Sequence, residues 1–312
     1  MTDTHVQSPQ VESPPVARRV PPSRRPWLTP GKVPYVLLSP VIILFAAFKV
    51  YPVGYAAWLS FTTNRGGVQG FAGFANYERI FSDPLFYNAL GNTLIILVIQ
   101  VPVMLILALL LAVALHSTLL KFRAVFRLGY FVPVVMGLVS YGVVFSMMLA
   151  TDNGIVNVAL QSVGLPAIPW LQDAFWAKIS LGIAMTWHYT GINAVIYLAQ
   201  RQSISGDLYE AASMDGADTV KQFFNVTIPG LRPAILLTVV TSTIGTLQLF
   251  DEPYILTNGG PDNATMTIGM YLYQNAFKFF DFGYASAIGF VLVGMVVIVS
   301  LVQFRFIQEK KS

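Results

Sequence analysis

Uncharged apolar runs about as long as a membrane is thick recur along this chain of 312 residues. Five of them are Thr93–Leu115, Leu128–Leu149, Ile179–Ala199, Ala234–Phe250 and Ala285–Phe304. A helix needs roughly 20 apolar residues to cross the ~30 Å of hydrocarbon in a bilayer. We expect each run to be a transmembrane helix, because a backbone in lipid must satisfy its hydrogen bonds internally.

A sixth apolar stretch precedes these five, from about Val33 to Phe61, and is interrupted by Pro40, Lys49 and Pro52. Proline inside a helix removes a hydrogen bond and bends the helix, so this stretch predicts a kinked or partly interfacial span. Hydrophobic residues make up 55% of the chain and charged residues only 11%, which is typical of a membrane protein. The fold class predicted is therefore all-α and polytopic, with six spans and both termini on one side.

The distribution of Lys and Arg gives the orientation, because cytoplasmic loops carry the excess. Four lie in loops on the side opposite the N-terminus, namely Arg65, Arg79, Lys178 and Lys278. Fourteen lie on the N-terminal side: Arg18, Arg19, Arg24, Arg25, Lys32, Lys121, Arg123, Arg127, Arg201, Lys221, Arg232, Arg305, Lys310 and Lys311. We expect both termini and the loops at 116–127 and 200–233 to be cytoplasmic.

The domain boundaries follow from these spans. Residues 1–32 are rich in proline and lack helical periodicity, which predicts a disordered cytoplasmic tail. Residues 33–306 form the predicted six-span domain, with a long cytosolic loop at 200–233, and residues 307–312 form a short cytoplasmic tail.

Several classes of function are disfavoured by what the sequence lacks. There is no cysteine, and the three histidines lie far apart, so no metal site is predicted. The basic residues are scattered between apolar runs, which argues against a nucleic-acid partner despite the net charge of +4. No constellation of catalytic side chains occurs, and no G-x-x-x-x-G-K-[ST] phosphate loop is present, so neither an enzyme nor an ATP-binding chain of that type is predicted.

The cytosolic loop at 200–233 contains the signals of two short helices. Ser205 or Asp207 can cap the first helix, Glu210 suits its positive end, and Gly216 can stop it in a left-handed conformation. Small side chains at 211 and 212 would allow another surface to approach this helix closely.

The second helix of the loop begins soon after the first. Thr219 with Gln222 three residues later fits a capping box. We expect this helix to end near Ile228, because the residue before a proline, here Pro229, is pushed away from helical angles. A loop helix lying on the bilayer is the alternative interpretation of the whole segment.

The loop resembles the EAA signature of the membrane subunits of binding-protein-dependent ABC importers. The matching residues are Glu210, Ala211, Ala212, Gly216, Val226, Ile228 and Pro229, at the spacing of that signature. Three further blocks resemble carbohydrate-uptake permeases of the maltose and glycerol-phosphate type: "GFANYERIFSDPLFYNALGNT" (Gly73–Thr93), "FDEPYILTNGGP" (Phe250–Pro261) and "GYASAIGF" (Gly283–Phe290). The resemblance spans about Val33 to Phe306, and it departs from the family where Gly191-Ile192 replaces a usual Pro-Phe pair and Ile204-Ser205 a usual Ile-Pro pair.

The resemblance implies that the loop is a coupling helix docking on a separate cytosolic ATPase. Glu210 would make a polar contact, and Ala211 and Ala212 would permit close approach. Gly216 would make the turn, Val226, Ile228 and Pro229 would anchor the second helix, and Asp215 belongs to the same set of coupling residues. ATP and Mg would be bound by the ATPase, with no cofactor in this chain. The implied partners are two ATPases, a second, non-identical permease, an extracytoplasmic solute-binding protein, a sugar-like solute and the lipid of a bacterial inner membrane.

Five residues are candidates for the solute pathway. The resemblance places Thr246, Gln248 and Asp251 near the outer half of the fifth span, and Trp187 and Asn193 are polar or aromatic positions of the fourth. Hydroxyl-rich solutes bind through hydrogen-bonding side chains and aromatic faces, although helix–helix hydrogen bonding is an equally good interpretation of each residue.

The alternative function is an ion-coupled secondary transporter. Such proteins usually carry carboxylates inside their spans and inverted repeats with broken helices. The five uncharged runs contain no Asp or Glu within 93–115, 128–149, 179–199, 234–250 and 285–304. The sequence therefore favours the permease subunit of an ATP-driven importer for a sugar or sugar-like solute, such as a disaccharide, an oligosaccharide or a glycerol-phosphate compound.

Overall fold

The computed structural model describes residues 32–65, 68–116 and 123–308. The predicted tail at 1–32 lies, apart from Lys32, outside the described residues, as does 309–312 of the C-terminal tail. The described part of the predicted tail at 307–312 is helical, because the last helix continues to Gln308. Two compact units, Met1–Val53 and Gly54–Ser312, are described separately.

The first unit contains α1 (Val33–Phe45), the π-helical turn η1 (Ala46–Val50) and the start of α2 (Tyr51–Ser60). In η1 the N–H of Tyr51 donates to the carbonyl of Ala46, five residues back. This wide turn stands immediately before Pro52, whose ring would clash with a carbonyl in a regular helix and which has no N–H to donate. The helix therefore continues past the proline, and Pro34–Ser60 is long and apolar enough to cross a membrane.

In the second unit, the end of α2 is followed by a small element that the sequence did not predict. β1 (Thr62–Arg65) and β2 (Val68–Phe71) form an antiparallel hairpin with Thr62 opposite Phe71. A short helix, α3 (Ala75–Ser82), follows, and its Asn76 donates to the carbonyls of Ser60 and Thr62 at 2.9 and 2.8 Å. These bonds attach the hairpin to α3 in place of a simple extramembrane loop.

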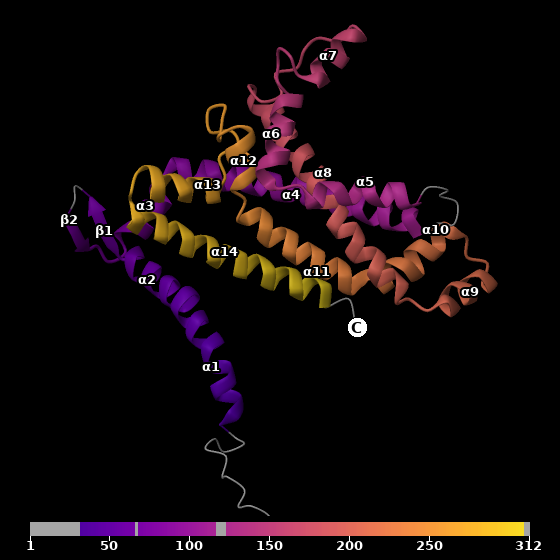
Figure 1. Cartoon of the computed structure of the whole chain (residues 1–312), viewed down its shortest axis with the longest axis horizontal. Helices are drawn as coiled ribbons and strands as arrows, with labels where there is room; N and C mark the ends of the chain where they lie inside the picture. The colour runs from indigo at the N-terminus through magenta and orange to yellow at the C-terminus, as the bar shows by residue number, and fades with distance from the viewer. Residues whose placement is uncertain (1–31, 66–67, 117–122, 309–312) are drawn as a thin grey trace, which may run out of the picture. The chain divides into compact units, whose positions relative to one another are not determined.

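Four long helices form the body of the second unit: α4 (Pro84–His116), α8 (Ala174–Gln202), α11 (Ile228–Leu247) and α14 (Phe282–Gln308). α8 packs along α4, and α11 contacts α4, α8 and α14, so that they run side by side in Figure 1. The hairpin and α3 lie at one end of these helices, and α9 (Gly206–Met214) and α10 (Thr219–Gln222) lie at the other.

The apolar run predicted as one span at Leu128–Leu149 contains two helices. α5 (Arg123–Val135) and α6 (Leu138–Met148) meet at a bend of 109°. Pro133 in the last turn of α5 limits hydrogen bonding there, and Gly137 adopts extended angles, φ −62° and ψ 143°. A short helix, α7 (Ile155–Ser162), follows α6.

Four helices of the described chain are long and apolar enough to cross a membrane, or five if α5 and α6 count as one bent span. The other predicted span, Ile179–Ala199, is helical as part of α8 but is not among them. Its window includes Thr186, His188, Thr190 and Asn193, which lower its mean hydropathy. The fold is thus a helical, polytopic membrane protein with four to five candidate spans.

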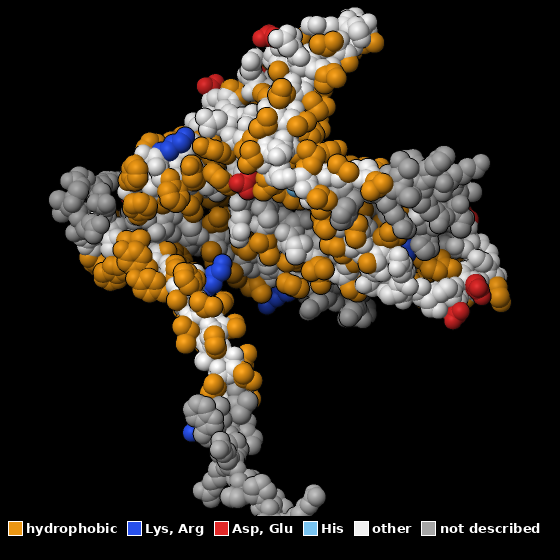
Figure 2. All heavy atoms as spheres, in the orientation of Figure 1, with side chains coloured by type: hydrophobic (Ala, Val, Ile, Leu, Met, Phe, Trp, Pro, Cys, Tyr) orange, Lys and Arg blue, Asp and Glu red, His pale blue; other side chains and the backbone are white. Residues whose placement is uncertain are grey.

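The exterior of the second unit is largely apolar. Figure 2 shows hydrophobic side chains over the visible faces of α11 and α14. Val98, Ile106, Val297 and Leu301 are each at least half exposed. Such an exterior is expected of helices that face lipid, because lipid tails impose no cost on exposed apolar side chains.

The region between α11 and α14 holds three short elements: α12 (Asp251–Leu256), α13 (Ile268–Tyr273) and the π-helical turn η3 (Gln274–Lys278). A core of buried residues lies beneath them and includes Ile80, Ile268, Met270, Tyr284 and Ile288. α12 packs against α6 and α8, which positions its acidic first turn beside the transmembrane helices.

Candidate functional site

The first helix of the loop at 200–233 is α9, and its predicted ends are confirmed. Ser205 caps it by accepting a hydrogen bond from the N–H of Asp207 at 3.3 Å. Gly216 has φ +76°, the left-handed conformation expected of a helix stop. The N–H of Ala217 then donates to the carbonyl of Ala212 at 2.9 Å and closes the turn.

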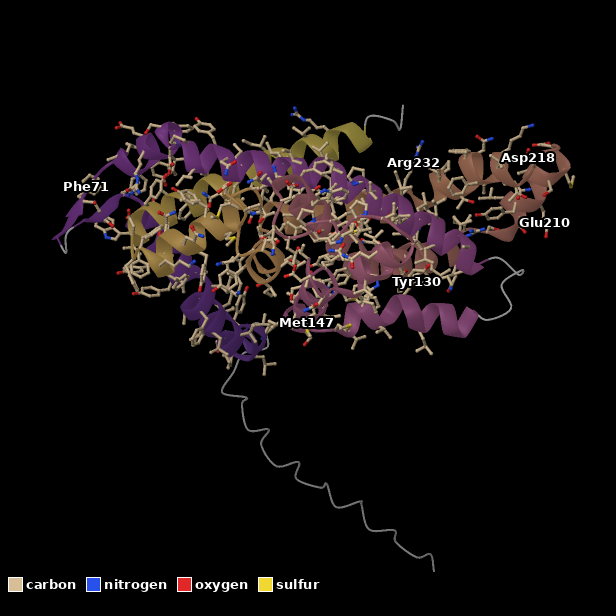
Figure 3. All side chains as sticks on the ribbon, turned by 90° about the horizontal axis from the view of Figure 1, so that it is seen from above. Phe71, Tyr130, Met147, Glu210, Asp218 and Arg232 are labelled. Carbon is tan, nitrogen blue, oxygen red and sulfur yellow. The ribbon has the colours of Figure 1, made fainter. Side chains whose placement is uncertain are left out.

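The part of α9 that begins the EAA match, together with the turn after it, is largely open to solvent. Glu210, Ala211, Asp215 and Gly216 are exposed, and Ala212 is half-buried. Figure 3 shows Glu210 on α9 beside Asp218 at the start of α10, at one end of the molecule. In Figure 2 acidic side chains lie over this same end.

The second helix is capped by a different residue from the one predicted. Asp218, not Thr219, is the N-cap, because its Oδ1 accepts from the N–H of Lys221 at 2.8 Å. The side chain of Gln222 does not reach back in a capping box. It donates to the Oγ of Ser213 at 2.8 Å and to the carbonyl of Ala217 at 3.2 Å, and so joins α10 to α9.

The prediction that this helix ends near Ile228 is wrong. α10 continues through the π-helical turn η2 (Phe223–Thr227) into α11, so that Thr219–Leu247 is one helical segment of 29 residues. The N–H of Ile228 donates five residues back, to Phe223, and Ile228 keeps helical angles. As at Pro52, the wide turn accommodates the proline that follows, here Pro229. Val226, Ile228 and Pro229 are all half-buried along this segment.

Two contacts fasten the base of the loop to the helical segment that follows it. The hydroxyls of Tyr209 and Thr227 lie 3.0 Å apart, which connects α9 to η2. Gly230 leaves room for the side chain of Ile204, and a Cβ at this glycine would overlap it. Ile204 belongs to the Ile-Ser pair that departs from the family pattern, and Ser205 serves there as the cap of α9.

A cavity of about 240 Å³ lies between α4, α8 and α11. Asn193 and Thr246, two of the five predicted pathway residues, both line it. The other lining residues are Gln100, Met104, Met185, Tyr189, Ile192, Ile196, Thr241, Ser242, Gly245 and Leu249. Amide and hydroxyl side chains thus share this cavity with one aromatic ring.

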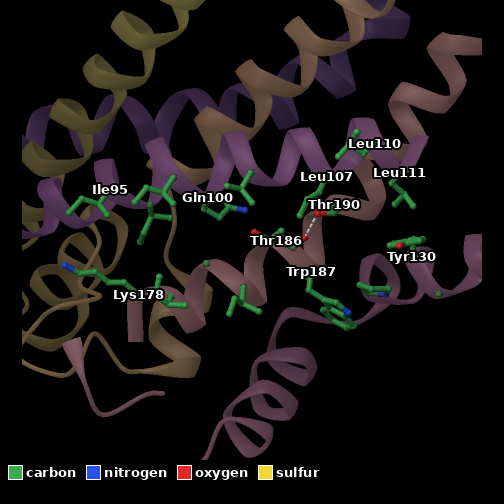
Figure 4. A pocket seen from close by; sticks show the side chains of 18 of the residues that line it. Ile95, Gln100, Leu107, Leu110, Leu111, Tyr130, Lys178, Thr186, Trp187 and Thr190 are labelled. Atoms are coloured by element: carbon green, nitrogen blue, oxygen red, sulfur yellow. Dashed lines mark hydrogen bonds between the residues drawn. The ribbon is translucent and has the colours of Figure 1, made fainter. Parts of the chain in front are cut away.

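A larger cavity of about 810 Å³ lies between α4, α5 and α8, and Trp187 lines it. Figure 4 shows Lys178 at one end and Tyr130 toward the other, with apolar side chains of α4 such as Leu107 between them. At Gly191 the helices α8 and α5 approach closely, because a Cβ there would overlap the carbonyl oxygen of Tyr130.

The remaining two predicted pathway residues line neither cavity. Gln248 is the exposed C-cap of α11, and Asp251 is exposed in the first turn of α12. The structure therefore brings Asn193 and Thr246 together, assigns Trp187 to the other cavity, and leaves Gln248 and Asp251 outside both.

Glu252 is a buried residue of this region that the sequence pattern did not indicate. Its side chain is only 3% exposed, and its Oε1 accepts from the hydroxyl of Tyr189 at 2.8 Å. Tyr141 stacks on His188 with ring centroids 4.3 Å apart in the same region. The only signal in the sequence was an acidic pair, Asp251-Glu252, beside the end of an apolar run, and nothing there showed that one member is buried.

The described residues include no group of three His, Cys, Asp or Glu side chains able to hold a metal ion. What the second unit offers instead is an exposed helical loop joined by a continuous helix to a polar cavity.

Comparison with known proteins gives this arrangement a family. Residues 75–311 match the model of the binding-protein-dependent transport system inner membrane component. The chain belongs to this family. It is therefore a multi-pass, inner-membrane permease component of an ABC transporter.

Two relatives show the range of the similarity. The lactose transport system permease protein LacF of Rhizobium radiobacter is 43% identical over 282 residues, covering 89% of this chain and 94% of that protein. The arabinooligosaccharides transport system permease protein AraP of Halalkalibacterium halodurans is 35% identical over 273 residues, covering 87% and 86%. The predicted family, the carbohydrate-uptake type of permease, is confirmed by these homologues.

A solved structure shares the fold of this chain. A chain of a bacterial ABC transporter involved in the import of the acidic polysaccharide alginate superposes with a TM-score of 0.79, covering 89% of this chain and 96% of that one. The two are 23% identical in sequence, so this likeness concerns the fold alone.

Proposed function

We propose that this permease forms one half of the pathway of an ATP-driven importer for a sugar or sugar-like solute, and that α9 and α10 couple it to a separate ATPase. The observation that carries the proposal is the single helical segment Thr219–Leu247. One of its ends is the exposed loop, and its other end carries Thr246, which lines the polar cavity. A displacement of the loop would therefore move the helix that lines the cavity, because no non-helical linker separates the two.

The surface of α9 suits docking on a partner. Ala211 has no side chain beyond Cβ, and Gly216 ends the helix without bulk, so a partner can approach the backbone closely. Glu210 is exposed beside them and would supply a charged contact. The hydrogen bonds of Gln222 to Ser213 and Ala217 keep α9 and α10 together as they are moved.

The cavity between α4, α8 and α11 suits a hydroxyl-rich solute. Gln100, Asn193 and Thr246 supply hydrogen-bonding groups, and Tyr189 supplies an aromatic ring. The side-chain amide of Asn193 already donates to the carbonyl of Tyr189 at 2.9 Å, which leaves its oxygen available to accept from a solute hydroxyl. The named substrates of the relatives, lactose and arabinooligosaccharides, are compounds of this chemistry.

The proposal includes six spans with both termini in the cytoplasm. The span that completes the six is α8, the fourth in chain order. Its 29 residues are long enough to cross a bilayer, and its polar side chains, such as Asn193, are buried in the bundle. The excess of Lys and Arg on the side of the loop supports the cytoplasmic position of α9 and α10.

The proposed assembly contains a second permease, two ATPases that bind ATP and Mg, and an extracytoplasmic solute-binding protein. This chain also shares its fold, with a TM-score of 0.74, with a chain in the solved structure of a bacterial alginate ABC transporter. That transporter is in complex with an alginate pentasaccharide-bound periplasmic protein. In such an assembly, closure of the ATPases on α9 would alternate the access of the cavity.

The test is affinity purification of the tagged chain from its own bacterium in mild detergent, followed by ATPase assays with sugars. We expect a second permease and an ATPase to co-purify, and sugar-stimulated hydrolysis to be lost in Glu210→Lys and Gly216→Pro. The matched control is Glu78→Lys, the same charge reversal at an exposed residue of α3, at the other end of the bundle.

Two results would overturn the proposal. One is normal sugar-stimulated hydrolysis in both loop variants. The other is isolation of this chain alone, able to move solute in vesicles when an ion gradient is imposed, which would identify a secondary transporter.

A further inference from the structure

A buried carboxylate lies directly behind the aromatic wall of the smaller cavity. Glu252 is 3% exposed, and it accepts a hydrogen bond of 2.8 Å from the hydroxyl of Tyr189. The same tyrosine lines the cavity between α4, α8 and α11. Tyr189 therefore links the two: it lines the cavity, and its hydroxyl group is hydrogen-bonded to the buried carboxylate of Glu252.

No ion pair of the described chain holds this carboxylate, and His188, which precedes Tyr189 on α8, lies within electrostatic range of it. The described residues form one ion pair, Arg79–Asp281, and it does not involve Glu252. The lining of the smaller cavity contains no Lys, Arg or His. Lys178 lines the larger cavity and precedes Tyr189 by eleven positions on α8, which is roughly 16 Å along the helix axis.

The carboxylate of Glu252 is held at this position by a hydrogen bond. The hydroxyl of Tyr189 donates to it at 2.8 Å. Burial of a charge is costly, so a buried acid within a membrane protein usually serves the transported solute or ion. A role in packing alone would be served by glutamine or methionine at lower cost.

We propose that Glu252 makes this half of the pathway selective for uncharged, hydroxyl-rich sugars and against anionic ones that carry carboxylate, phosphate or sulfonate groups. This inference rests on the proposed function and narrows its substrate class. A neutral sugar can hydrogen-bond to Asn193 and Thr246 without cost from the nearby charge. An anion at the face of Tyr189 is repelled by Glu252 through a medium of low dielectric constant.

Coulomb's law sets the size of the effect. Two unit charges about 8 Å apart, in a medium of effective dielectric constant ~20, change an affinity roughly 30-fold. Screening by water in the cavity lowers this value, so discrimination of about tenfold between a neutral sugar and its anionic counterpart is expected from Glu252. Glycerol-phosphate compounds, which the sequence left open as substrates, are thereby disfavoured.

The test compares matched neutral and anionic sugars on the purified importer complex in proteoliposomes. The probes are lactose and a phosphorylated lactose, each measured by equilibrium binding without the solute-binding protein, so that only the permease pathway contributes. The variant is Glu252→Gln, which keeps the side-chain volume and an oxygen that accepts from Tyr189 but removes the charge. We expect the preference for the neutral sugar to fall about tenfold in this variant, mainly through tighter binding of the anion.

Two control variants separate charge from packing. Tyr189→Phe removes the hydrogen bond and keeps the carboxylate, so it should change the affinity for both sugars and retain the preference. Asp251→Asn removes a neighbouring charge that is exposed and lies outside the cavity lining, so it should alter the preference less than Glu252→Gln. Sugar-stimulated ATP hydrolysis of each variant with lactose reports whether the complex is intact.

The inference fails if the wild-type complex binds the anionic sugar as well as the neutral one, or if Glu252→Gln leaves the ratio unchanged. The proposed function fails separately, if no sugar of either kind stimulates ATP hydrolysis by the wild-type complex together with its binding protein.

Discussion

The hydroxyl of Tyr284 donates to Oδ2 of Asp83 at 2.6 Å, although the two residues are 201 positions apart. Tyr271 donates to the same oxygen, and the N–H of Leu85 donates to the other oxygen at 2.9 Å. One carboxylate thus joins the start of α4 to α13 and α14. Burial alone would raise the pKa of Asp83, but the hydrogen bonds from Tyr271 and Tyr284 outweigh it and lower this pKa below its usual value.

Acidification should destabilise this end of the protein. A carboxyl whose pKa is lowered by folding contributes stability above its unfolded pKa, near 3.9, and loses it as the pH falls through the folded value. We expect the melting temperature of the detergent-solubilised permease to fall below about pH 4, and Asp83→Asn to flatten that dependence while lowering stability at neutral pH. Thermal unfolding followed by tryptophan fluorescence checks this, with Asp152→Asn, in the turn before α7, as the control. If the melting temperature of Asp83→Asn fell at low pH as steeply as that of the wild type, other carboxyl groups would be responsible for the acid sensitivity.

Gly191 should not accept a side chain. A Cβ there would overlap the carbonyl oxygen of Tyr130, so Gly191→Ala must separate α8 from α5, and overpacking of this kind costs about 1–3 kcal/mol. Gly182 lies on the same helix with nothing near its Cβ position, so Gly182→Ala should gain roughly 0.5–1 kcal/mol through helix propensity. Melting temperatures of the two variants should therefore move in opposite directions. A loss in both would mean that α8 tolerates no alanine for another reason.

The cap of α10 can be tested by one pair of substitutions. Asp218→Ala removes the acceptor of the Lys221 N–H and should cost about 1 kcal/mol of local stability. Thr219→Ala removes the residue that the sequence pattern favoured and should change little, because alanine is a good helix former. Amide hydrogen exchange over residues 219–222 measures both. Faster exchange in Thr219→Ala than in Asp218→Ala would contradict the Asp218 cap and support the predicted capping box of Thr219 and Gln222.

Gln222 should govern transmission through the loop and not the stability of the bundle. Its side chain holds Ser213 and Ala217, so Gln222→Leu frees α9 from α10 while leaving α11 intact. We expect normal insertion and normal solute binding, with a severalfold loss of sugar-stimulated ATP hydrolysis. Asn225→Leu, at an exposed position of η2, is the control. Full stimulation in Gln222→Leu would show that the two loop helices need not move together.

Local chemistry was enough to predict several features of the site. Ser205 caps the start of α9, and Gly216 ends the helix in the left-handed conformation that glycine adopts easily. Both were predictable because capping depends on residues within one turn. The positions of the long helices were also predictable, since an apolar run of membrane length has few alternatives in lipid. The cap at Asp218 was missed because Asp218 and Thr219 are adjacent candidates and the pairing with Gln222 favoured the wrong one.

At two prolines the helices differ from the sequence-based expectation. Pro229 was expected to end a helix, but the wide turn η2 carries the chain through into α11. Pro133 lies in an apolar run that was expected to be one span, and there the helix breaks by 109° at Met136 and Gly137. Whether a proline is absorbed or breaks the helix depends on the contacts that neighbouring elements offer, and the sequence around it does not contain them.

By itself, the sequence determined the class of the protein, its family signature and the composition of its loop, because each depends on residue type and spacing alone. Only the tertiary structure decided that Asn193 and Thr246, on α8 and α11, meet in one cavity while Asp251 stays outside, and that Glu252 is buried behind Tyr189. The physical reason is that a cavity is made by side chains from several helices. The rotation of each helix about its own axis is fixed by packing against all the others, and not by its own sequence.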